Sequence, residues 1–135
     1  MSRIITYLTF NGNCREAMRF YQACLGGTLE FQTIEESPLS VNLPSAFKKC
    51  ILHATLRHGQ ALLLGTDMVG DNGLKKGNSV SMMIDCGSQN EIRTYLSNLS
   101  EGGLLIAPLE ENYWGALVGE VQDKFGNYWL LKYQS

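Results

Sequence analysis

The sequence predicts an α+β fold built from two βαβββ modules, which form curved mixed sheets around a cavity. Two observations support this prediction. The order strand, helix, strand, strand, strand occurs twice along the 135 residues, a length typical of one domain. Three short motifs also recur in the same order, which indicates duplication. The recurring pairs are Arg19-x-Tyr21-x-x-x-Leu25 with Arg93-x-Tyr95-x-x-x-Leu99, Gly26-Gly27 with Gly102-Gly103, and residues 58–63 with 125–130.

The first module begins with residues 4–10, whose β-branched and aromatic side chains predict a strand. Asn13 lies three residues before Glu16, a spacing that predicts a capping box at the start of a helix. Apolar residues at helical spacing follow, and Gly26-Gly27 ends the helix. The remaining predicted strands of this module are residues 28–34, 50–56 and 61–64, with a loop at 37–48.

The second module follows a polar, glycine-rich bridge at residues 67–78. Ser88 and Glu91 have the spacing of another capping box, and an apolar helix face follows. The predicted strands are residues 80–85, 104–107, 117–121 and 128–133. We therefore expect a single domain, 1–135, whose modules occupy about 3–66 and 79–135.

Each predicted module covers one face of its sheet with its helix and leaves the other face bare. Two bare faces must pack against each other, or against a second chain, to remove apolar surface from water. The space between curved sheets is a natural place for a ligand. The duplication therefore predicts a cavity.

Composition argues against several classes of partner. The net charge is −2, and basic residues are scattered, so we expect no nucleic-acid partner. No apolar run is long enough to span a bilayer and none resembles a signal peptide, so we expect no membrane partner and a cytoplasmic location. The four cysteines lack metal-site spacing and predict reduced, mostly buried thiols.

Motifs at both ends of the chain resemble one protein family. Residues 7–17, with Phe20-Tyr21 after them, form an opening motif, and Trp114-Gly115, Gly119 and residues 123–129 form a closing one. Together they resemble the PhnB-like branch of the vicinal oxygen chelate superfamily, which includes glyoxalases, bleomycin-resistance proteins and extradiol dioxygenases. The resemblance implies paired βαβββ modules and a homodimer.

The same resemblance implies where a metal would be held. Enzymes of the superfamily place four ligands, usually His and Glu, on the first and last strand of each module. Here those positions are Thr6, Leu63 or Leu64, residues 79–81, and Leu130. None supplies an imidazole or a carboxylate, so we expect no metal, no other cofactor and no Lewis-acid chemistry.

Several residues are predicted to line the cavity, and Glu120 is the one catalytic candidate among them. A carboxylate in an apolar cavity could act as an acid or base, whereas an outward-facing strand glutamate is the simpler interpretation. His53 and His58 are similarly predicted to be ordinary strand and turn residues. The full set of expected lining residues is Thr6, Leu8, Leu63, Ser79, Ser81, Met83, Tyr113, Trp114, Glu120 and Leu130.

The leading functional hypothesis is metal-independent binding of a small molecule of unknown identity by a homodimer. One alternative is a lyase or isomerase that uses Glu120 or a histidine as acid or base, with or without an atypical metal. Another is an interaction module without a ligand. Methyltransferase names occur in the PhnB-like branch, but the sequence has no glycine-rich S-adenosylmethionine loop after a strand, so we do not expect that activity.

Overall fold

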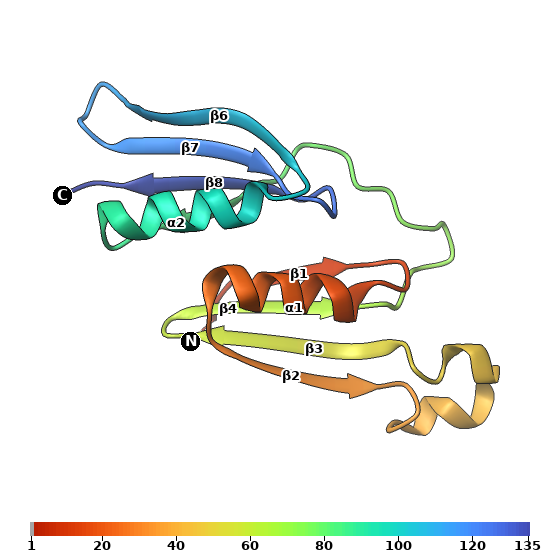
Figure 1. Ribbon diagram of the computed structural model, residues 1–135. Coiled ribbons are helices and arrows are strands. Elements are labelled where there is room, and N and C mark those ends of the chain that lie inside the picture. The colour runs from red at the N-terminus through yellow and green to blue at the C-terminus, as the bar shows by residue number, and fades with distance from the viewer. Residues whose placement is uncertain (1) are drawn as a thin grey trace. The chain divides into compact units, whose positions relative to one another are not determined.

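The structure is a computed structural model that describes residues 2–135 and contains two compact units. One unit ends at Lys75, and the other runs from Lys76 to Ser135. Each unit contains one four-stranded mixed sheet and one α-helix (Figure 1). The predicted α+β class and the two-module architecture are therefore confirmed.

The N-terminal module contains two parallel neighbours, its first and last strands, at one side of its sheet. The strand order is β1-β4-β3-β2, and all pairs except β1–β4 are antiparallel. Two short 3₁₀ turns occupy the connection between β2 and β3 (Figure 1). The elements are β1 (Thr6–Thr9), α1 (Cys14–Leu25), β2 (Thr28–Thr33), the 3₁₀ turns Pro38–Asn42 and Ser45–Phe47, β3 (Ile51–His58) and β4 (Ala61–Thr66).

The C-terminal module repeats this topology strand for strand, with the order β5-β8-β7-β6 and a parallel β5–β8 pair. Its strand β6 is longer than the sequence predicted, and β5 is shorter. The elements are β5 (Met82–Asp85), α2 (Gln89–Ser100), β6 (Leu104–Glu111), β7 (Leu117–Gln122) and β8 (Tyr128–Tyr133). Within residues 2–135, no helix has the length and apolar character needed to cross a membrane.

The second glycine after each helix is required for the same reason in both modules. A Cβ atom at Gly27 would overlap the carbonyl oxygen of Arg57, and one at Gly103 would overlap that of Gln122. Both glycines precede the first strand of a hairpin, at the point where that strand begins to pair with the next. The repeat of this close contact supports the duplication at the level of backbone packing.

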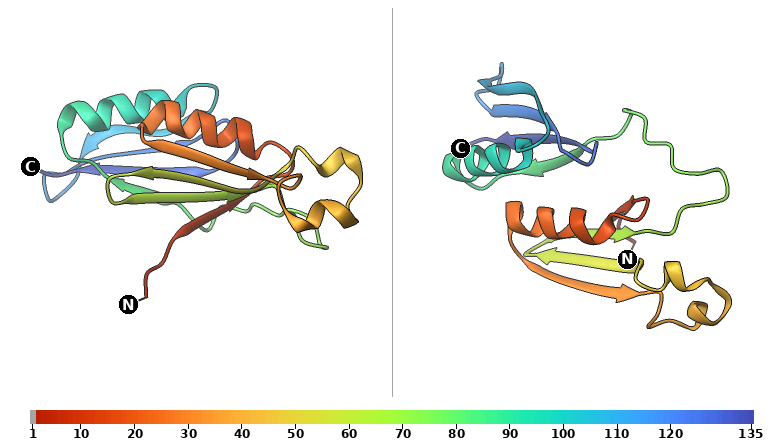
Figure 2. Two further views of the ribbon diagram at one scale, coloured as in Figure 1. Left: turned by 90° about the horizontal axis from the view of Figure 1, so that it is seen from below. Right: turned by 45° about the vertical axis from the view of Figure 1, so that its right-hand side comes forward.

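The helix of each module packs against one face of its own sheet (Figure 2). In the N-terminal module, α1 buries Ala17, Met18 and Tyr21. A Cβ atom added at Gly65 in β4 would lie about 3.0 Å from the Cys14 sulfur of this helix, which identifies the side of the sheet that α1 covers. We call this side the helix face, and the opposite side, without a helix of the same module, the open face.

In the C-terminal module, α2 covers the equivalent face. It buries Ile92, Leu96 and Leu99, and a Cβ added at Gly119 in β7 would lie 3.0 Å from a methyl group of Leu96. Because strand side chains alternate, Trp129 shares this helix face with Gly119, and it is only 3% exposed.

The two helices begin differently. The Ser88 hydroxyl accepts a hydrogen bond from the Glu91 amide at 3.0 Å, so the cap predicted for α2 is confirmed. Asn13 occupies the N-cap position of α1, but its side chain makes no capping hydrogen bond, so the predicted capping box is wrong there. Instead, the Asp67 carboxylate accepts from the Cys14 amide at 2.9 Å and supplies the missing acceptor from the end of β4.

Candidate functional site

Strand pairing decides which predicted lining residues of the N-terminal module lie on its open face. Leu8 pairs with Gly65, which faces α1, and Thr6 pairs with Leu63, two residues earlier on the same side. Thr6, Leu8 and Leu63 therefore lie on the helix face, one residue out of register with the expectation.

The positions that do lie on the open face of this module are their neighbours Tyr7 and Leu64. These two residues pair with each other across β1 and β4. A shift of one residue reverses the side to which a strand residue points, so the difference from the sequence expectation is a matter of register.

In the C-terminal module, the predicted residues Met83, Leu130 and Glu120 share the open face. Leu130 pairs with Met83 on one side and with Glu120 on the other. Ser79 and Ser81 precede β5 and are exposed to solvent. The structure therefore brings together a Met, a Leu and a Glu on one surface of this module.

The open-face positions of the first and last strands do not fit a metal ion. They are the pairs Tyr7–Leu64 and Met83–Leu130, which offer one phenol and one thioether and no carboxylate or imidazole. Across residues 2–135, no group of three His, Cys, Asp or Glu side chains is placed to hold a metal ion. The superfamily's usual ligand chemistry is thus missing from these positions.

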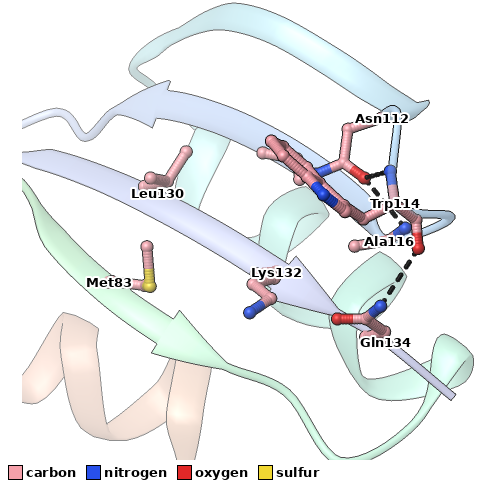
Figure 3. Close-up of a pocket in the computed structure, with 8 residues that line it drawn as sticks. Met83, Asn112, Trp114, Ala116, Leu130, Lys132 and Gln134 are labelled. Carbon is pink, nitrogen blue, oxygen red and sulfur yellow. Dashed lines mark hydrogen bonds between the residues drawn. The ribbon is translucent and has the colours of Figure 1, made fainter.

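A groove of about 450 Å³ lies on the open face of the C-terminal module (Figure 3). This volume falls within the usual range for small-molecule pockets, about 300–1,000 Å³. Its floor comes from β5, β7 and β8, and its end comes from the loop between β6 and β7 together with Gln134. The lining residues are Met83, Asn112, Trp114, Ala116, Val118, Leu130, Lys132 and Gln134.

Two side chains, Asn112 and Gln134, hold the loop at the end of the groove. The Asn112 side-chain oxygen accepts hydrogen bonds from the amides of Trp114 and Ala116, both at 3.0 Å. The Asn112 amide in turn donates to the Ala116 carbonyl at 2.9 Å. From the C-terminal segment, the Gln134 side chain donates to the Trp114 carbonyl at 3.0 Å (Figure 3). Four hydrogen bonds thus fix the backbone that carries the Trp114 indole.

The two aromatic residues of this loop differ in their surroundings. Trp114 lines the groove and is 76% exposed, so a large apolar surface is available to a ligand. Tyr113 was also predicted to line a cavity, but it is 100% exposed and is not among the residues of the groove. Their rings contact each other edge to face, with centroids 6.3 Å apart.

Charge in the groove comes from Lys132. Glu120 lies on the same open face, one step along β7 from the groove, but it is not one of the lining residues. Among the residues that the structure describes, no hydrogen bond or ion pair holds the Lys132 ammonium. The groove therefore combines an apolar floor, an indole and one cation.

Sequence reasoning missed five of the lining residues. Alternation along β8 could have found Lys132, because it lies two residues after Leu130 on the same face. Alternation along β7 could likewise have found Val118, because it lies two residues before Glu120 on the same face. The other three come together only through the hydrogen bonds of the folded loop and the chain end. They are Asn112, Ala116 and Gln134.

The cysteines and histidines do not add reactive groups to the groove. Burial, reinforced by the negative charge of Asp67, raises the pKa of the Cys14 thiol to about 12. Burial likewise raises the pKa of Cys86 to about 11. A thiol with such a pKa is a poor nucleophile at neutral pH. His53 and His58 lie on β3 of the other module, and both are exposed.

A second hollow, of about 390 Å³, lies beside the start of α1, and its lining includes Arg15, Arg19 and Lys49. Amide groups at a helix start are suited to bind an anion. Here the amides of Gly12 and Cys14 already donate to Asp67, at 3.0 and 2.9 Å. The chain's own carboxylate thus takes the anion position, and the groove of the C-terminal module is the stronger candidate site.

Comparisons with known proteins agree with this architecture. The family model described as 3-demethylubiquinone-9 3-methyltransferase matches residues 2–132. The crystal structure of protein PA1353 from Pseudomonas aeruginosa is similar at 33% identity and a TM-score of 0.87, over 99% of this chain and 98% of that one.

Two further solved structures extend the comparison. A Bacillus cereus protein described as a putative 3-demethylubiquinone-9 3-methyltransferase, PhnB protein, is 27% identical with a TM-score of 0.75, over 98% of this chain and 100% of that one. A glyoxalase-related enzyme from Fulvimarina pelagi is 17% identical with a TM-score of 0.65, over 99% and 89%. The last similarity shows a shared fold.

Proposed function

Because the chain belongs to the PhnB-like family of the glyoxalase/bleomycin-resistance/dioxygenase superfamily, we propose that it binds a small apolar or aromatic molecule without a metal ion. The binding site is the groove on the open face of the C-terminal module. The observation that carries the proposal is the fixed, solvent-facing Trp114 beside an apolar floor.

The shape and chemistry of the groove support a flat ligand. Met83, Val118 and Leu130 form a floor without buried polar groups, and the Trp114 indole stands at one end. Aromatic rings prefer offset-stacked or edge-to-face partners, with about 0.5–1.5 kcal/mol beyond the area that they bury. Because four hydrogen bonds already order the loop, binding does not have to order it, which lowers the entropic cost.

The residues at the usual metal positions support metal independence. Leucine offers no lone pair, and a thioether or a neutral phenol binds divalent metals weakly. We therefore expect affinity for the ligand to be unchanged when the protein is treated with a chelator.

Methyl transfer, which the family description mentions, has no support in the residues around the groove. Two glycines lie between a strand and the helix that follows it, Gly12 before α1 and Gly87 before α2. The Gly12 amide donates to Asp67 and the Gly87 amide donates to Glu91, so neither is available to a cofactor. The proposal is therefore binding, not group transfer.

The test uses naphthalene-2-carboxamide, a flat and uncharged probe. Isothermal titration measures its affinity for the wild type and for Trp114→Ala. We expect about tenfold weaker binding in the variant, since aromatic contact and apolar burial are both lost. Tyr113→Ala is the matched control, because it removes the adjacent aromatic ring outside the groove. If both variants bind like the wild type, the groove is not the site.

Glu120 supports a second candidate function, that of an enzyme with a carboxylate acid or base. It pairs with Leu130 on the open face, so a ligand that extends beyond the groove would reach it. We expect Glu120→Gln to leave the affinity for a bound ligand within about twofold and to abolish any conversion of that ligand. If a converted substrate were found and its turnover survived this substitution, the catalytic role would be excluded.

We also propose that the chain forms a homodimer. The groove on the open face of the C-terminal module exposes two large apolar side chains, Met83 at 59% and Trp114 at 76%. Contiguous exposed apolar surface usually marks a binding or association site. Light scattering after gel filtration tests this: a mass near twice 15.0 kDa is expected, and a mass of one chain at 100 µM contradicts it.

A further inference from the structure

We infer that the ligand of the groove carries an anionic group, such as a carboxylate, phosphonate or sulfonate, and that the Lys132 ammonium binds it. This inference rests on the proposed function, because it names the chemical class of the molecule bound at that same site. It would make the ligand an amphipathic anion with a flat apolar body.

The first support is the charge inventory of the groove. Of its eight lining residues, Lys132 alone is ionisable, and it is positive. A purely apolar ligand would leave this ammonium beside an apolar body, where it loses hydration without a partner. An anionic group on the ligand removes that cost and gains a charge-assisted hydrogen bond.

The second support is that Lys132 is available. The structure gives its ammonium neither a hydrogen bond nor an ion pair within the described chain. Its neighbour across the parallel pair is Asp85, on β5, and no ion pair joins the two. Figure 3 shows the Lys132 amine directed along the open face between Met83 and Gln134.

The third support is the position of Lys132 relative to the apolar part of the groove. It lies two residues after Leu130 on β8 and pairs with Val118 on β7. Residues two apart on a strand are about 6.6 Å apart along one face. A ring placed over Leu130 therefore puts a substituent within reach of the lysine side chain.

The other polar groups of the groove have assigned partners. The Asn112 oxygen is occupied by two amides, which leaves its amide nitrogen as a donor that suits an anion. Gln134 uses its nitrogen for the Trp114 carbonyl and keeps its oxygen as an acceptor. A ligand with a hydroxyl or amide group beside the anion would match that oxygen.

The test compares two probes of equal size, naphthalene-2-carboxylate and naphthalene-2-carboxamide, by isothermal titration. The wild type is expected to bind the carboxylate about fivefold to tenfold more tightly, as a half-buried charged hydrogen bond implies. Lys132→Met should bring the ratio of the two affinities close to one, whatever its absolute affinity for the carboxamide. Urea unfolding of the variant beside the wild type shows whether it is folded. Lys132→Arg should retain the preference for the carboxylate.

Lys75→Met is the matched control, because it removes the same charge from an exposed residue outside the groove. The preference for the carboxylate should persist in this variant and should shrink as salt screens the charges.

The outcomes separate the two proposals. If the wild type binds both probes equally, or if Lys132→Met keeps the preference, the anionic assignment is overturned and the groove proposal stands. If Lys75→Met also lost the preference for the carboxylate, the preference would come from the overall charge of the protein, and the assignment of the anion to Lys132 would be overturned. If neither probe binds, the proposed function itself fails.

Discussion

The side chain whose removal tests the fold most sharply is Asp67, which joins three segments of the N-terminal module. One carboxylate oxygen accepts from the amides of Gly12 and Cys14, at 3.0 and 2.9 Å, and the other accepts from the Ile51 amide at 2.8 Å. Asp67→Ala leaves all three amides without this acceptor. The Gly12 amide is exposed and water replaces the carboxylate there, whereas the other two are partly buried.

An unmade hydrogen bond of a buried backbone group costs about 1–3 kcal/mol. Two amides are only partly buried, so each is expected to cost about 1.5 kcal/mol, in the lower half of that range. Asp67→Ala should therefore lower the free energy of unfolding by about 3 kcal/mol. That corresponds to a fall in Tm of about 10 °C for a domain of this size. Urea unfolding followed by circular dichroism gives the free energy, and thermal unfolding gives Tm.

Two further variants sharpen this prediction. Asp67→Asn keeps one oxygen for Gly12 and Cys14 but presents an amide NH₂ to the Ile51 amide, so about half of the loss is expected. Asp71→Ala is the matched control on the exposed bridge and should change stability by less than about 0.5 kcal/mol. If Asp67→Ala changed stability as little as this control, Asp67 would not stabilise the module by joining its three segments.

Three other predictions use the same unfolding assay. Asn112→Ala removes the acceptor of two loop amides, so it should lower the free energy of unfolding by about 1–2 kcal/mol and weaken binding of naphthalene-2-carboxamide. If stability and binding were both unchanged, Asn112 would not order the loop. Trp129→Phe removes an indole N–H that donates to the Asp123 carboxylate at 2.7 Å, so it should lower the free energy of unfolding by about 2 kcal/mol. A decrease below about 0.5 kcal/mol would show that this hydrogen bond contributes little. Burial raises the pKa of Cys14 to about 12, so above the ordinary thiol pKa of 9.0 the folded chain keeps a proton that the unfolded chain loses. Stability should therefore fall as pH rises from about 9 towards 12, with a shallower slope in Cys14→Ala, and equal slopes would contradict the shift.

The sequence predicted the order of elements because each boundary carries a local signal. Close backbone contacts that recur in both modules require Gly27 and Gly103, and Ser88 caps its helix as its spacing implied. Such signals act over a few residues, so a single sequence contains them.

The sides of the strands were predictable only where polar residues alternate with apolar ones. In the C-terminal module, Glu120 and Gln122 on β7 and Lys132 on β8 mark the open face. Of the residues expected there, Met83, Glu120 and Leu130 do lie on it. In the N-terminal module, residues 6–9 and 61–64 contain no such alternation, so the sequence does not distinguish Leu63 from Leu64.

The groove and the role of Asp67 depend on contacts between distant residues. Gln134 reaches the Trp114 carbonyl across 20 residues, and Asp67 reaches Gly12 across 55. No local pattern encodes either hydrogen bond. The glycine-rich bridge, which was expected to begin at residue 67, begins with a residue that fixes the preceding module.

The most direct test of metal-independent binding uses the two indole N–H signals of the chain in a ¹H–¹⁵N spectrum. Trp114 lines the groove, whereas Trp129 is buried and donates to Asp123. When naphthalene-2-carboxamide is added to protein treated with EDTA, metal-independent binding in the groove predicts a saturable shift of the Trp114 signal and an unchanged Trp129 signal. A Trp114 signal that stays fixed, or that moves only after a divalent metal is restored, would contradict metal-independent binding there.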